Sequence, residues 1–363
     1  MANKVNRILI LGKGRIGKAV QHYLRKYSPK FRVSFFNKKT NPKNYSLFIS
    51  ALPGDVGRLG LRLALRFKKD LIDLSDVEHK FYLKAKKEIK KRKILVAPLC
   101  GFSPGLTNFI CGREAKENKV ARIEILAGTL SPKEHSFPFL WCFKDLIEGH
   151  TSKAVLIKSG RKIKAPPFSD LRKEKTLRQG LRVSLSRTPQ EKIRKIEAES
   201  YLADGLTSLP HTLEVKNMSY RILRPAGFYI FFEYLKSHGF FKKENIAQTK
   251  KILEAKKENN LTAGIIRVKT SKKEIVWQLK SFSKSDEKLN SMQKITAILP
   301  AALAQIVLKG DFSQKGLFFP EQLGADKTLF KKIINKTNRV GGIRIMKKRK
   351  QSQAKQTKEK KLP

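Results

Sequence analysis

The chain has 363 residues, of which 79 are lysine or arginine and 30 are aspartate or glutamate, so its formal net charge is +49. At roughly 150 residues per domain this length predicts about two domains. A hydrophobic content of 40% excludes disorder along most of the chain. The three cysteines, Cys100, Cys111 and Cys142, are too few and too widely spaced for a disulfide scaffold, which favours reduced thiols.

Two features predict a cytoplasmic protein with no membrane partner. No apolar run approaches the roughly 18–20 residues of a transmembrane helix. The first apolar run, Ile8–Leu11, is shorter than the core of about 7–15 residues that a signal peptide needs.

The excess of basic residues has two interpretations. Strongly basic proteins are often binders of nucleic acid or another polyanion. Residues 347–363 contain eight basic residues and one acidic residue, but most of the charge is spread over the rest of the chain. No RNP, zinc-finger or helix-turn-helix signature accompanies it. Non-specific nucleic-acid binding and a lysine-rich, merely solvated surface are therefore both open.

The first part of the chain alternates between short apolar strands and amphipathic helices. Strands are predicted at Arg7–Leu11, Phe31–Phe36, Ser46–Leu52, Asp70–Leu74 and Lys93–Ala97, with helices at Arg15–Tyr27, Asp55–Lys69 and Val77–Arg92. This alternation is typical of right-handed βαβ units, which build a parallel sheet.

The pattern changes after about Gly105. Helices are predicted at Leu106–Glu117, Gly227–Ser237 and Ser291–Leu308, strands at Val120–Leu130 and Met218–Leu223, and hairpins at Ala154–Lys164 and Gly264–Ser281. Hairpins in this region indicate a mixed or antiparallel sheet. The low-complexity basic segment from Lys347 onwards is predicted to be disordered.

A glycine-rich turn, Gly12-Lys13-Gly14-Arg15-Ile16-Gly17, lies between the first strand and the first helix. In this context Gly12 permits a tight turn, Gly14 lets the backbone approach a pyrophosphate, and Gly17 lets the helix pack closely on the sheet. The free N–H groups at the helix start, with the positive end of the helix dipole, would receive the phosphates. We therefore predict a dinucleotide site that includes Arg15 and Ile16. A structural glycine turn without a ligand is the alternative.

The end of the second strand predicts which dinucleotide binds. NAD-specific folds often place an acidic residue there for the ribose 2′-OH, whereas this chain has Asn37, Lys38 and Lys39. An amide and two cations would attract a 2′-phosphate through charge-assisted hydrogen bonds. We therefore predict NADP in preference to NAD. Two more solvated lysines are the alternative.

These patterns together predict an α/β protein with two domains. A Rossmann-type parallel-sheet domain is expected at residues 1–104, completed by about 291–335. An α+β substrate and dimerisation domain with a mixed or antiparallel sheet is expected at 105–290, and a disordered basic tail at 347–363.

Further motifs follow the glycine turn in a fixed order. They are Ser50-Ala51-Leu52-Pro53, Ile72-Asp73-Leu74-Ser75, Pro98-Leu99-Cys100-Gly101-Phe102-Ser103-Pro104-Gly105-Leu106-Thr107-Asn108, Trp141-Cys142, Leu146-Ile147-Glu148, Asp204-Gly205-Leu206, Arg224 with Gly227, and Lys315-Gly316-Leu317-Phe318-Phe319-Pro320-Glu321-Gln322. From about Arg7 to Lys332, the chain in this way resembles the saccharopine dehydrogenase (saccharopine reductase) family, including its lysine 6-dehydrogenase relatives. The segment Cys100–Asn108 is the most specific match.

The resemblance implies an NAD(P)-dependent, homodimeric oxidoreductase that acts on a C–N bond of an amino acid in lysine metabolism. It implies cofactor contacts from Ser50, Ala51, Leu52, Pro53 and Ser75, and substrate contacts from Gly101, Ser103, Pro104, Gly105, Asn108, Trp141 and Arg224. Arg224 and Asp204 are the catalytic candidates. Arg224 would bind the amino-acid carboxylate as a bidentate fork, and Asp204 would relay a proton or pair with an ammonium group.

Each of these assignments has a structural alternative. Arg224 is otherwise a surface arginine, Asp204 a turn former before Gly205, Asn108 a turn stabiliser and Trp141 a core aromatic residue. Cys100 is interpreted as a packed small hydrophobe, because hydride transfer needs no thiol. The histidines are scattered, without H-x-x-x-H spacing, and no C-x-x-C is present, so no metal site is expected.

The chain also departs from the family pattern. Only nine residues separate Asn37 from Leu47, where relatives insert a helix and a strand. Leu99 stands where the family often has Asp, Asp145 where Gly is usual, and Phe228 where His is usual. These departures leave a nucleotide-binding pseudoenzyme of the same fold as the second hypothesis, and a basic nucleic-acid-associated protein as the third.

Overall fold

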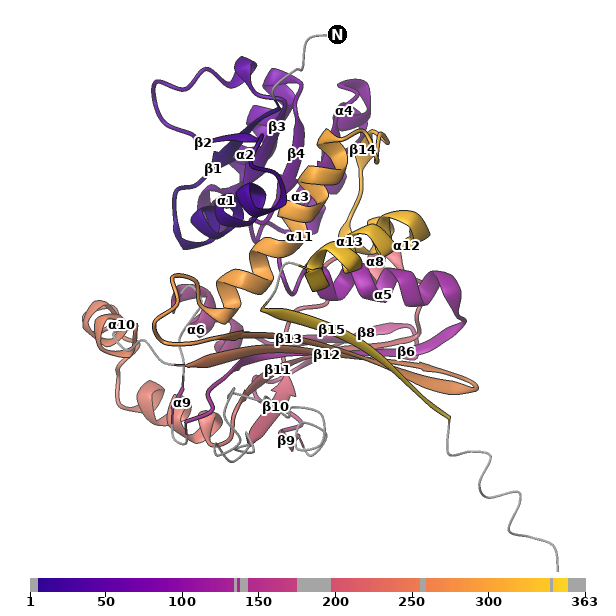
Figure 1. Ribbon diagram of the computed structural model, residues 1–363. Coiled ribbons are helices and arrows are strands. Elements are labelled where there is room, and N and C mark those ends of the chain that lie inside the picture. The colour runs from indigo at the N-terminus through magenta and orange to yellow at the C-terminus, as the bar shows by residue number, and fades with distance from the viewer. Residues whose placement is uncertain are drawn as a thin grey trace, which may run out of the picture. The chain divides into compact units, whose positions relative to one another are not determined.

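The computed structural model describes residues 6–133, 136–137, 143–174, 197–254, 259–339 and 342–351. The chain divides into two compact units (Figure 1). The first unit consists of residues 1–120, 207–214 and 293–345, and the second of residues 121–206, 215–292 and 346–363. The sequence placed the boundary after residue 104, whereas the structure assigns the helix that follows to the first unit.

A six-stranded sheet forms the centre of the first unit. Its order is β14-β5-β4-β3-β1-β2. The strands are β1 (Arg7–Leu11), β2 (Arg32–Phe35), β3 (Leu47–Ser50), β4 (Asp70–Asp73), β5 (Leu95–Ala97) and β14 (Gly316–Leu317). All neighbouring strands pair in parallel, which confirms the predicted fold class. The chain moves outward in opposite directions from β1 and β3, so the point where the strand order reverses lies between these two strands.

Helices join these strands and supply the rest of the unit's core. They are α1 (Arg15–Tyr27), α2 (Gly54–Phe67), α3 (His79–Lys84), α4 (Lys86–Lys91), α5 (Leu106–Glu117), α8 (Leu209–Thr212), α11 (Ser291–Leu308), α12 (Pro320–Ala325) and α13 (Lys327–Arg339), with a 3-10 turn at Pro42–Asn44. The single helix predicted at Val77–Arg92 is wrong in one respect, because Ala85 ends α3 and begins α4. The apolar residues Tyr82 and Ile89, one in each short helix, pack into the same core cluster, which explains why the periodicity looked continuous.

Helix α11 qualifies the expectation that no segment is long and apolar enough to cross a membrane. Among the described residues it is the one helix that meets both conditions, with a mean hydropathy of 1.3 over 18 residues. Inside the structure 78% of that stretch is buried, as in the core helix of a folded domain.

The second unit is built on a nine-stranded mixed sheet. Its main order is β15-β13-β12-β6-β11-β10-β9, with the β7–β8 hairpin attached to β11. The strands are β6 (Val120–Leu130), β7 (Ala154–Lys158), β8 (Arg161–Ala165), β9 (Arg172–Lys173), β10 (Ala198–Leu202), β11 (Asn217–Pro225), β12 (Asn260–Thr270), β13 (Lys273–Ser283) and β15 (Ile343–Gln351). Strands β6 and β11 are parallel, whereas β10–β11, β12–β13 and β7–β8 are antiparallel. The remaining helices are α6 (Phe143–Thr151), α9 (Phe228–Ser237) and α10 (Ile246–Glu254).

The predicted basic tail needs a correction. Residues 347–351 continue strand β15, in which Ile343 and Ile345 are buried. Lys347 lies over the ring of Trp277, with its Nζ atom 5.1 Å from the ring centroid. The alternating apolar residues at 343–346 form the first part of a strand, and the first basic residues of the tail continue that strand. Residues 352–363 lie outside the described part of the chain.

Candidate functional site

The turn between β1 and α1 has the geometry of a dinucleotide cradle. Gly12 has φ of 103°, and a Cβ atom there would lie 2.6 Å from the carbonyl oxygen of Ala51. A Cβ on Gly17 would lie 2.0 Å from the carbonyl oxygen of Gly12. Both positions therefore require glycine for the close approach of backbone to backbone.

Gly14 differs from Gly12 and Gly17, and the space around it shows whether the turn fits a diphosphate. A Cβ on Gly14 would meet no atom within 4 Å, so the fold itself does not require glycine there. No side chain caps the start of α1, and its first turn has no acidic residue. The open space beside N–H groups at the positive end of a helix fits the phosphates of a dinucleotide.

The predicted cofactor residues lie at one edge of the parallel sheet. Gly12, Gly14, Arg15, Ile16 and Gly17 follow β1, Asn37 and Lys38 follow β2, Ser50, Ala51, Leu52 and Pro53 end or follow β3, and Ser75 follows β4. The carboxyl ends of parallel strands meet at the same edge, so the fold brings these positions together. Ligands of such sheets bind at this edge, at the point where the strand order reverses.

Asn37 and its neighbours form a tight exposed turn at the end of the edge strand β2. The backbone N–H of Lys39 and the hydroxyl of Thr40 donate to Asn37 Oδ1, at 2.9 and 3.1 Å. Lys38 and Lys39 are exposed. The turn places two cations after β2, where an NAD-specific fold would place a carboxylate.

Ser50 and Ser75 are placed at the expected strand ends, but their side chains are engaged inside the unit. Their hydroxyl groups lie 2.9 Å apart. Ser75 N donates to Asp73 Oδ1 at 2.8 Å, and the Tyr82 hydroxyl donates to Asp73 Oδ2 at 2.9 Å. Burial raises the pKa of Asp73 to about 6, although these hydrogen bonds lower it. The side chain that organises this network, Asp73, was quoted in the sequence motif but given no role.

The segment Gly101–Gly105 after β5 turns back on itself. Gly105 has φ of 133°, and a Cβ there would lie 2.1 Å from the carbonyl oxygen of Gly101. The Ser103–Pro104 bond is cis, and the Thr107 hydroxyl donates to Ser103 Oγ at 2.9 Å. Only glycine fits at position 105, so the close turn after β5 depends on this residue.

Asn108 is fully buried in the first turn of α5. Its Oδ1 accepts from Gly105 N at 3.5 Å, and its Nδ2 donates to Thr207 Oγ1 at 3.4 Å. Both contacts favour the turn-stabilising interpretation of Asn108. Thr207 belongs to residues 207–214, a segment from the middle of the chain that packs in the first unit.

A buried carboxyl group, Glu321, lies at the contact of this segment with α12. Thr212 Oγ1 donates to Glu321 Oε1 at 2.6 Å, and burial raises the pKa of Glu321. A Cβ on Gly112 of α5 would lie 1.8 Å from the Glu321 carbonyl oxygen, so α5 and α12 touch backbone to backbone. Glu321 lies within one of the sequence motifs, but no residue near it in the sequence indicates that Thr212 will donate a hydrogen bond to it.

Cys100 and Cys111 are buried free thiols. Burial raises the pKa of the Cys100 thiol, and the charge of Asp73 adds to the effect. A thiol held in its neutral form is a poor nucleophile, consistent with a packing role.

In the second unit, Arg224 is a buried cation without a carboxylate partner among the described residues. It is 5% exposed and lies directly opposite Glu199 in the β10–β11 register. Glu199 instead accepts from the backbone N–H groups of Gly227 and Tyr229, at 2.9 and 2.7 Å, at the start of α9. The guanidinium carbon of Arg224 lies 5.2 Å from the centroid of the Phe228 ring. Its Nε has no acceptor in the described part of the chain, and burial lowers the pKa of Arg224.

Two further polar side chains next to Arg224 were missed by the sequence analysis. His150 Nδ1 donates to the Leu146 carbonyl at 2.5 Å, so Nε2 is a bare acceptor, and no described residue donates to it. Burial, and then the charge of Arg224, lowers the pKa of His150 to about 3, so the ring is neutral. The hydroxyl of Tyr201 is buried beside both and interacts with the guanidinium of Arg224, which stabilises the charged form of the arginine.

The imidazole of His150 lies beside the ring of Phe228, one of the positions at which the sequence analysis expects a departure from the family pattern. The two ring centroids are 5.1 Å apart. An imidazole is thus present beside this position, supplied by α6. A single histidine on a helix gives no sequence signal of such a placement.

The other predicted residues of the second unit do not join this cluster. Asp204 is exposed in the turn after β10 and lies five residues beyond Glu199, roughly 16 Å along an extended chain. Trp141 lies outside the described residues. No group of three or more metal-ligating side chains occurs within the described ranges.

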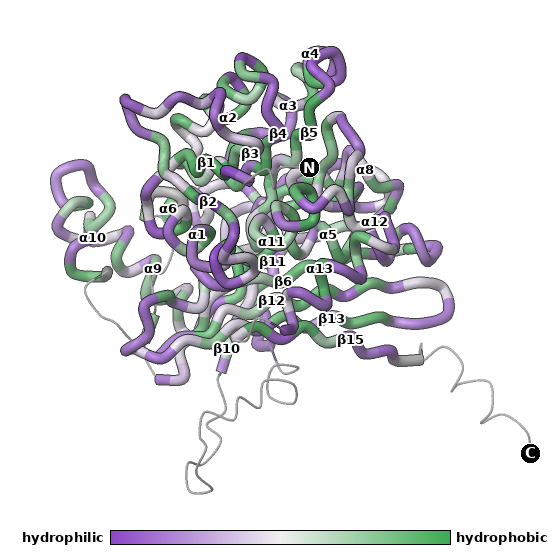
Figure 2. Tube along the Cα trace, turned by 45° about the horizontal axis from the view of Figure 1, so that its top comes forward, coloured by the Kyte–Doolittle hydropathy of each residue, from purple (hydrophilic) through white to green (hydrophobic). Residues whose placement is uncertain are grey.

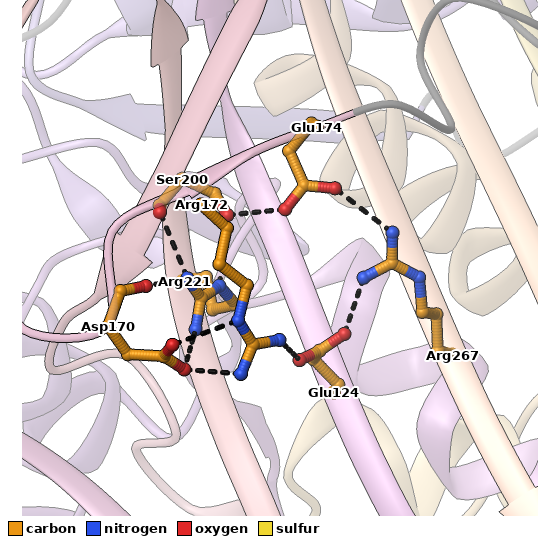
Figure 3. Close-up of polar contacts among 7 residues, drawn as sticks. All are labelled: Glu124, Asp170, Arg172, Glu174, Ser200, Arg221 and Arg267. Atoms are coloured by element: carbon orange, nitrogen blue, oxygen red, sulfur yellow. Dashed lines mark hydrogen bonds and ion pairs between the residues drawn. The ribbon is translucent and has the colours of Figure 1, made fainter.

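The opposite face of the same sheet carries a closed ring of charges (Figure 3). Arg221, which is fully buried, donates to Ser200 Oγ at 2.9 Å and to Asp170 Oδ2 at 2.8 Å. The ring continues through Arg172, Glu124, Arg267 and Glu174 and returns to Ser200. Three arginines face three carboxylates, so within this ring of described residues every charge has an opposite charge beside it.

Comparison with known proteins places this geometry in context. The family model described as "Saccharopine dehydrogenase C-terminal domain" matches residues 101–343. No curated protein matches the chain by sequence.

Among solved structures, saccharopine dehydrogenase (L-Glu forming) from Saccharomyces cerevisiae is similar over 95% of this chain and 100% of its own, with a TM-score of 0.70 and 14% identity. At that identity the likeness concerns the fold alone. DAP dehydrogenase from C. glutamicum, in complex with DAP, gives a TM-score of 0.42 at 12% identity over 88% of this chain and 93% of its own. Aspartate dehydrogenase from Thermotoga maritima gives 0.38 at 12% identity over 83% and 96%.

Proposed function

Because this chain belongs to the saccharopine dehydrogenase C-terminal domain family, we propose that it is a nicotinamide-dependent oxidoreductase acting on a C–N bond of an amino acid. The family and the fold support the coarser statement, an oxidoreductase of the dehydrogenase type. The sequence resemblance to saccharopine dehydrogenases is thereby confirmed. The finer proposals below concern the substrate and the cofactor.

The observation that carries the proposal is Arg224, buried without a carboxylate counter-ion in the described part of the chain. A buried charge without a partner is costly, so such a site favours an incoming anion. The planar guanidinium suits a carboxylate, because two parallel N–H groups can bind its two oxygens. An amino-acid carboxylate is the anion that the family's chemistry requires.

The neighbouring groups complement an amino acid further. The Tyr201 hydroxyl can donate a second hydrogen bond to a carboxylate, and the bare Nε2 of neutral His150 can accept one from an amine. When bound, the nicotinamide would supply or accept the hydride, and the protein would hold the C–N bond in place. In the first unit, the glycine turn would hold the cofactor's diphosphate.

The cofactor preference that we propose is NADP. Its support is the exposed turn Asn37–Lys39, whose two cations attract a 2′-phosphate and whose position lacks a carboxylate for a ribose hydroxyl. Fluorescence titration of the full chain should give tighter binding of NADPH than of NADH. Tighter binding of NADH would refute this preference.

Turnover tests the proposed reaction. With NADPH, the full chain should consume lysine together with 2-oxoglutarate; with NADP+, it should oxidise saccharopine in the reverse direction. Lysine metabolism is the named proposal. Arg224→Met should raise KM for the amino acid roughly hundredfold, since the loss of an arginine–carboxylate pair typically costs this much or more. Arg224→Lys should recover part of the binding, because charge returns without the fork. Arg122→Met, which removes an exposed arginine from β6, is the matched control.

A nucleotide-binding pseudoenzyme of the same fold is the second candidate. It is favoured by Leu99, a fully buried apolar residue where the family often has Asp. Coenzyme binding without turnover across related amino and keto acids would favour this candidate over the first. A homodimer, which the resemblance implies, and a cytoplasmic location, which the lack of a long apolar run suggests, stay as proposals.

A further inference from the structure

Helices α9 and α10 of the second unit carry an unusual surface. The three most exposed large hydrophobic side chains of the described residues all lie there: Ile230 at 72%, Ile252 at 58% and Tyr234 at 56% exposure. Phe240, in the turn between the two helices, is 37% exposed. Isolated exposed apolar residues are common, but a concentration of this kind within 23 residues marks an interaction surface.

The composition of α9 explains why an apolar face is left over. Seven of its ten residues are hydrophobic, yet only Phe228, Phe232 and Leu235 face the core of the unit. Ile230 and Tyr234 are four residues apart and so lie on one outward face. A helix that is apolar on nearly every side is normally buried on every side.

Helix α10 is held against the end of α9 rather than hanging free. Thr249 Oγ1 donates to the Phe240 carbonyl at 2.8 Å, and Asn245 Nδ2 donates to the Gly239 carbonyl at 3.0 Å. These bonds fix α10 to the turn that follows α9, so the exposed residues of both helices belong to one connected segment. Helices α9 and α10 lie next to each other in both views (Figure 1 and Figure 2).

Exposed lysines occur in the same segment as the exposed apolar residues. Lys242, Lys243, Lys250 and Lys251 are exposed, and none of them forms an ion pair with a described residue. Lys236 is bonded to Glu233 at 3.4 Å, and Glu244 is the one other exposed acid whose side chain is described in this stretch. Exposed aromatic and aliphatic side chains accompanied by lysines are the signature of a helix that lies in the interface of an anionic bilayer.

We propose that the α9–α10 surface docks this protein on an anionic lipid bilayer, with Ile230, Tyr234, Phe240 and Ile252 inserted among the headgroups and the four lysines on lipid phosphates and carboxylates. A second copy of the chain fits poorly, because a symmetric contact would set the lysines of one copy against those of the other. This surface contact differs from the sequence expectation of no membrane partner, which rested on the lack of a long apolar run.

The test is co-sedimentation of the full chain with vesicles of phosphatidylcholine alone and of phosphatidylcholine and phosphatidylserine in equal parts. We expect binding to the anionic vesicles and little to the neutral ones. Replacing Lys242, Lys243, Lys250 and Lys251 by Gln should weaken binding roughly a hundredfold or more, since each surface lysine contributes about a five-fold factor. Ile230→Ser with Tyr234→Ser should weaken it roughly tenfold or more, because their apolar area no longer inserts.

The matched control removes the same amount of charge from α4 of the first unit, whose one apolar residue, Ile89, is buried. Changing the exposed residues Lys86, Lys87, Lys90 and Lys91 to Gln should leave vesicle binding within about two-fold, with the remaining difference due to net charge alone. The proposal is overturned by absence of binding to anionic vesicles, by equal binding to neutral ones, by an equal loss in the control, or by retention of binding in the Ser variant. All substituted residues are on the surface, so unchanged circular dichroism verifies the fold of each variant.

Discussion

The two faces of the second unit's sheet treat a buried arginine in opposite ways. Arg221 and Arg224 are three residues apart on β11 and therefore point to opposite faces. Arg221 is bonded to Asp170 and Ser200 within a ring in which every charge has a partner. Arg224 faces a carboxylate that is already bonded to α9, and it has no ion pair with any described residue. The comparison teaches that burial of an arginine is not itself a functional signal, whereas burial without a counter-ion is.

The first unit shows the same contrast among its glycines. Gly12 and Gly17 are required by backbone atoms that a Cβ would strike, whereas Gly14 has open space around it. In the second unit the arginine without a counter-ion is available to a ligand, and in the first unit the space beside Gly14 is.

The largest expected effect separates the two arginines. Arg221→Met removes a fully buried guanidinium and leaves Ser200 Oγ and the Ser200 carbonyl without this donor, so it should lower the free energy of unfolding by about 3 kcal/mol. Arg224→Met removes a charge without a partner and should leave stability unchanged or raised, while substrate binding is lost. Urea unfolding measures both. The control is Arg172→Met, whose side chain is 48% exposed and whose loss should cost about 1 kcal/mol or less. A larger loss for Arg224→Met than for Arg221→Met would contradict the comparison.

The glycine turn offers the second test. Gly17→Ala forces a Cβ to within 2.0 Å of a backbone oxygen and should lower the free energy of unfolding by about 3 kcal/mol. Gly14→Ala meets no atom and should cost less than about 1 kcal/mol. The dissociation constant for NADPH should nevertheless rise at least about tenfold in Gly14→Ala, because the methyl group fills the space left for a phosphate. Unchanged NADPH affinity in a folded Gly14→Ala variant would show that the turn does not hold a dinucleotide.

Acidification should change the free energy of unfolding least of the three tests. It should destabilise the second unit and stabilise the first. His150 has a folded pKa of about 3, below the roughly 6.5 of the unfolded chain, so unfolding binds a proton and the second unit loses about 2 kcal/mol from about pH 7 to about pH 5. Asp73 has a folded pKa of about 6, above the roughly 3.9 of the unfolded chain, so the first unit gains about 1 kcal/mol over the same interval.

Hydrogen exchange at the two pH values, assigned to each unit, measures these changes. His150→Asn and Asp73→Asn should each flatten the response of their own unit only. If either substitution altered the pH response of the opposite unit instead, the assignment of these two groups would be incorrect.

Much of the first unit followed from the sequence alone. The bounds of β1, α1, α5 and α11 agree with those predicted, as do those of β6 in the second unit. Each of these segments has a strong local signal, such as a buried apolar run or a helical periodicity. The glycine turn also belongs here, because its spacing encodes backbone geometry directly. Strand β10, strand β15 and helices α12 and α13 were not predicted.

The tertiary structure alone decided which side chains have partners. Arg221 and Arg224 look alike in the sequence, and nothing near either one indicates that Asp170 will reach the first while α9 occupies the carboxylate opposite the second. His150 and Tyr201 come from α6 and β10, and their polar atoms meet Arg224 only after the sheet has formed. Local sequence determines backbone conformation because the forces that set φ and ψ act over a few residues. The pairing of buried charges depends on contacts between distant segments, so it is settled only when the chain has folded.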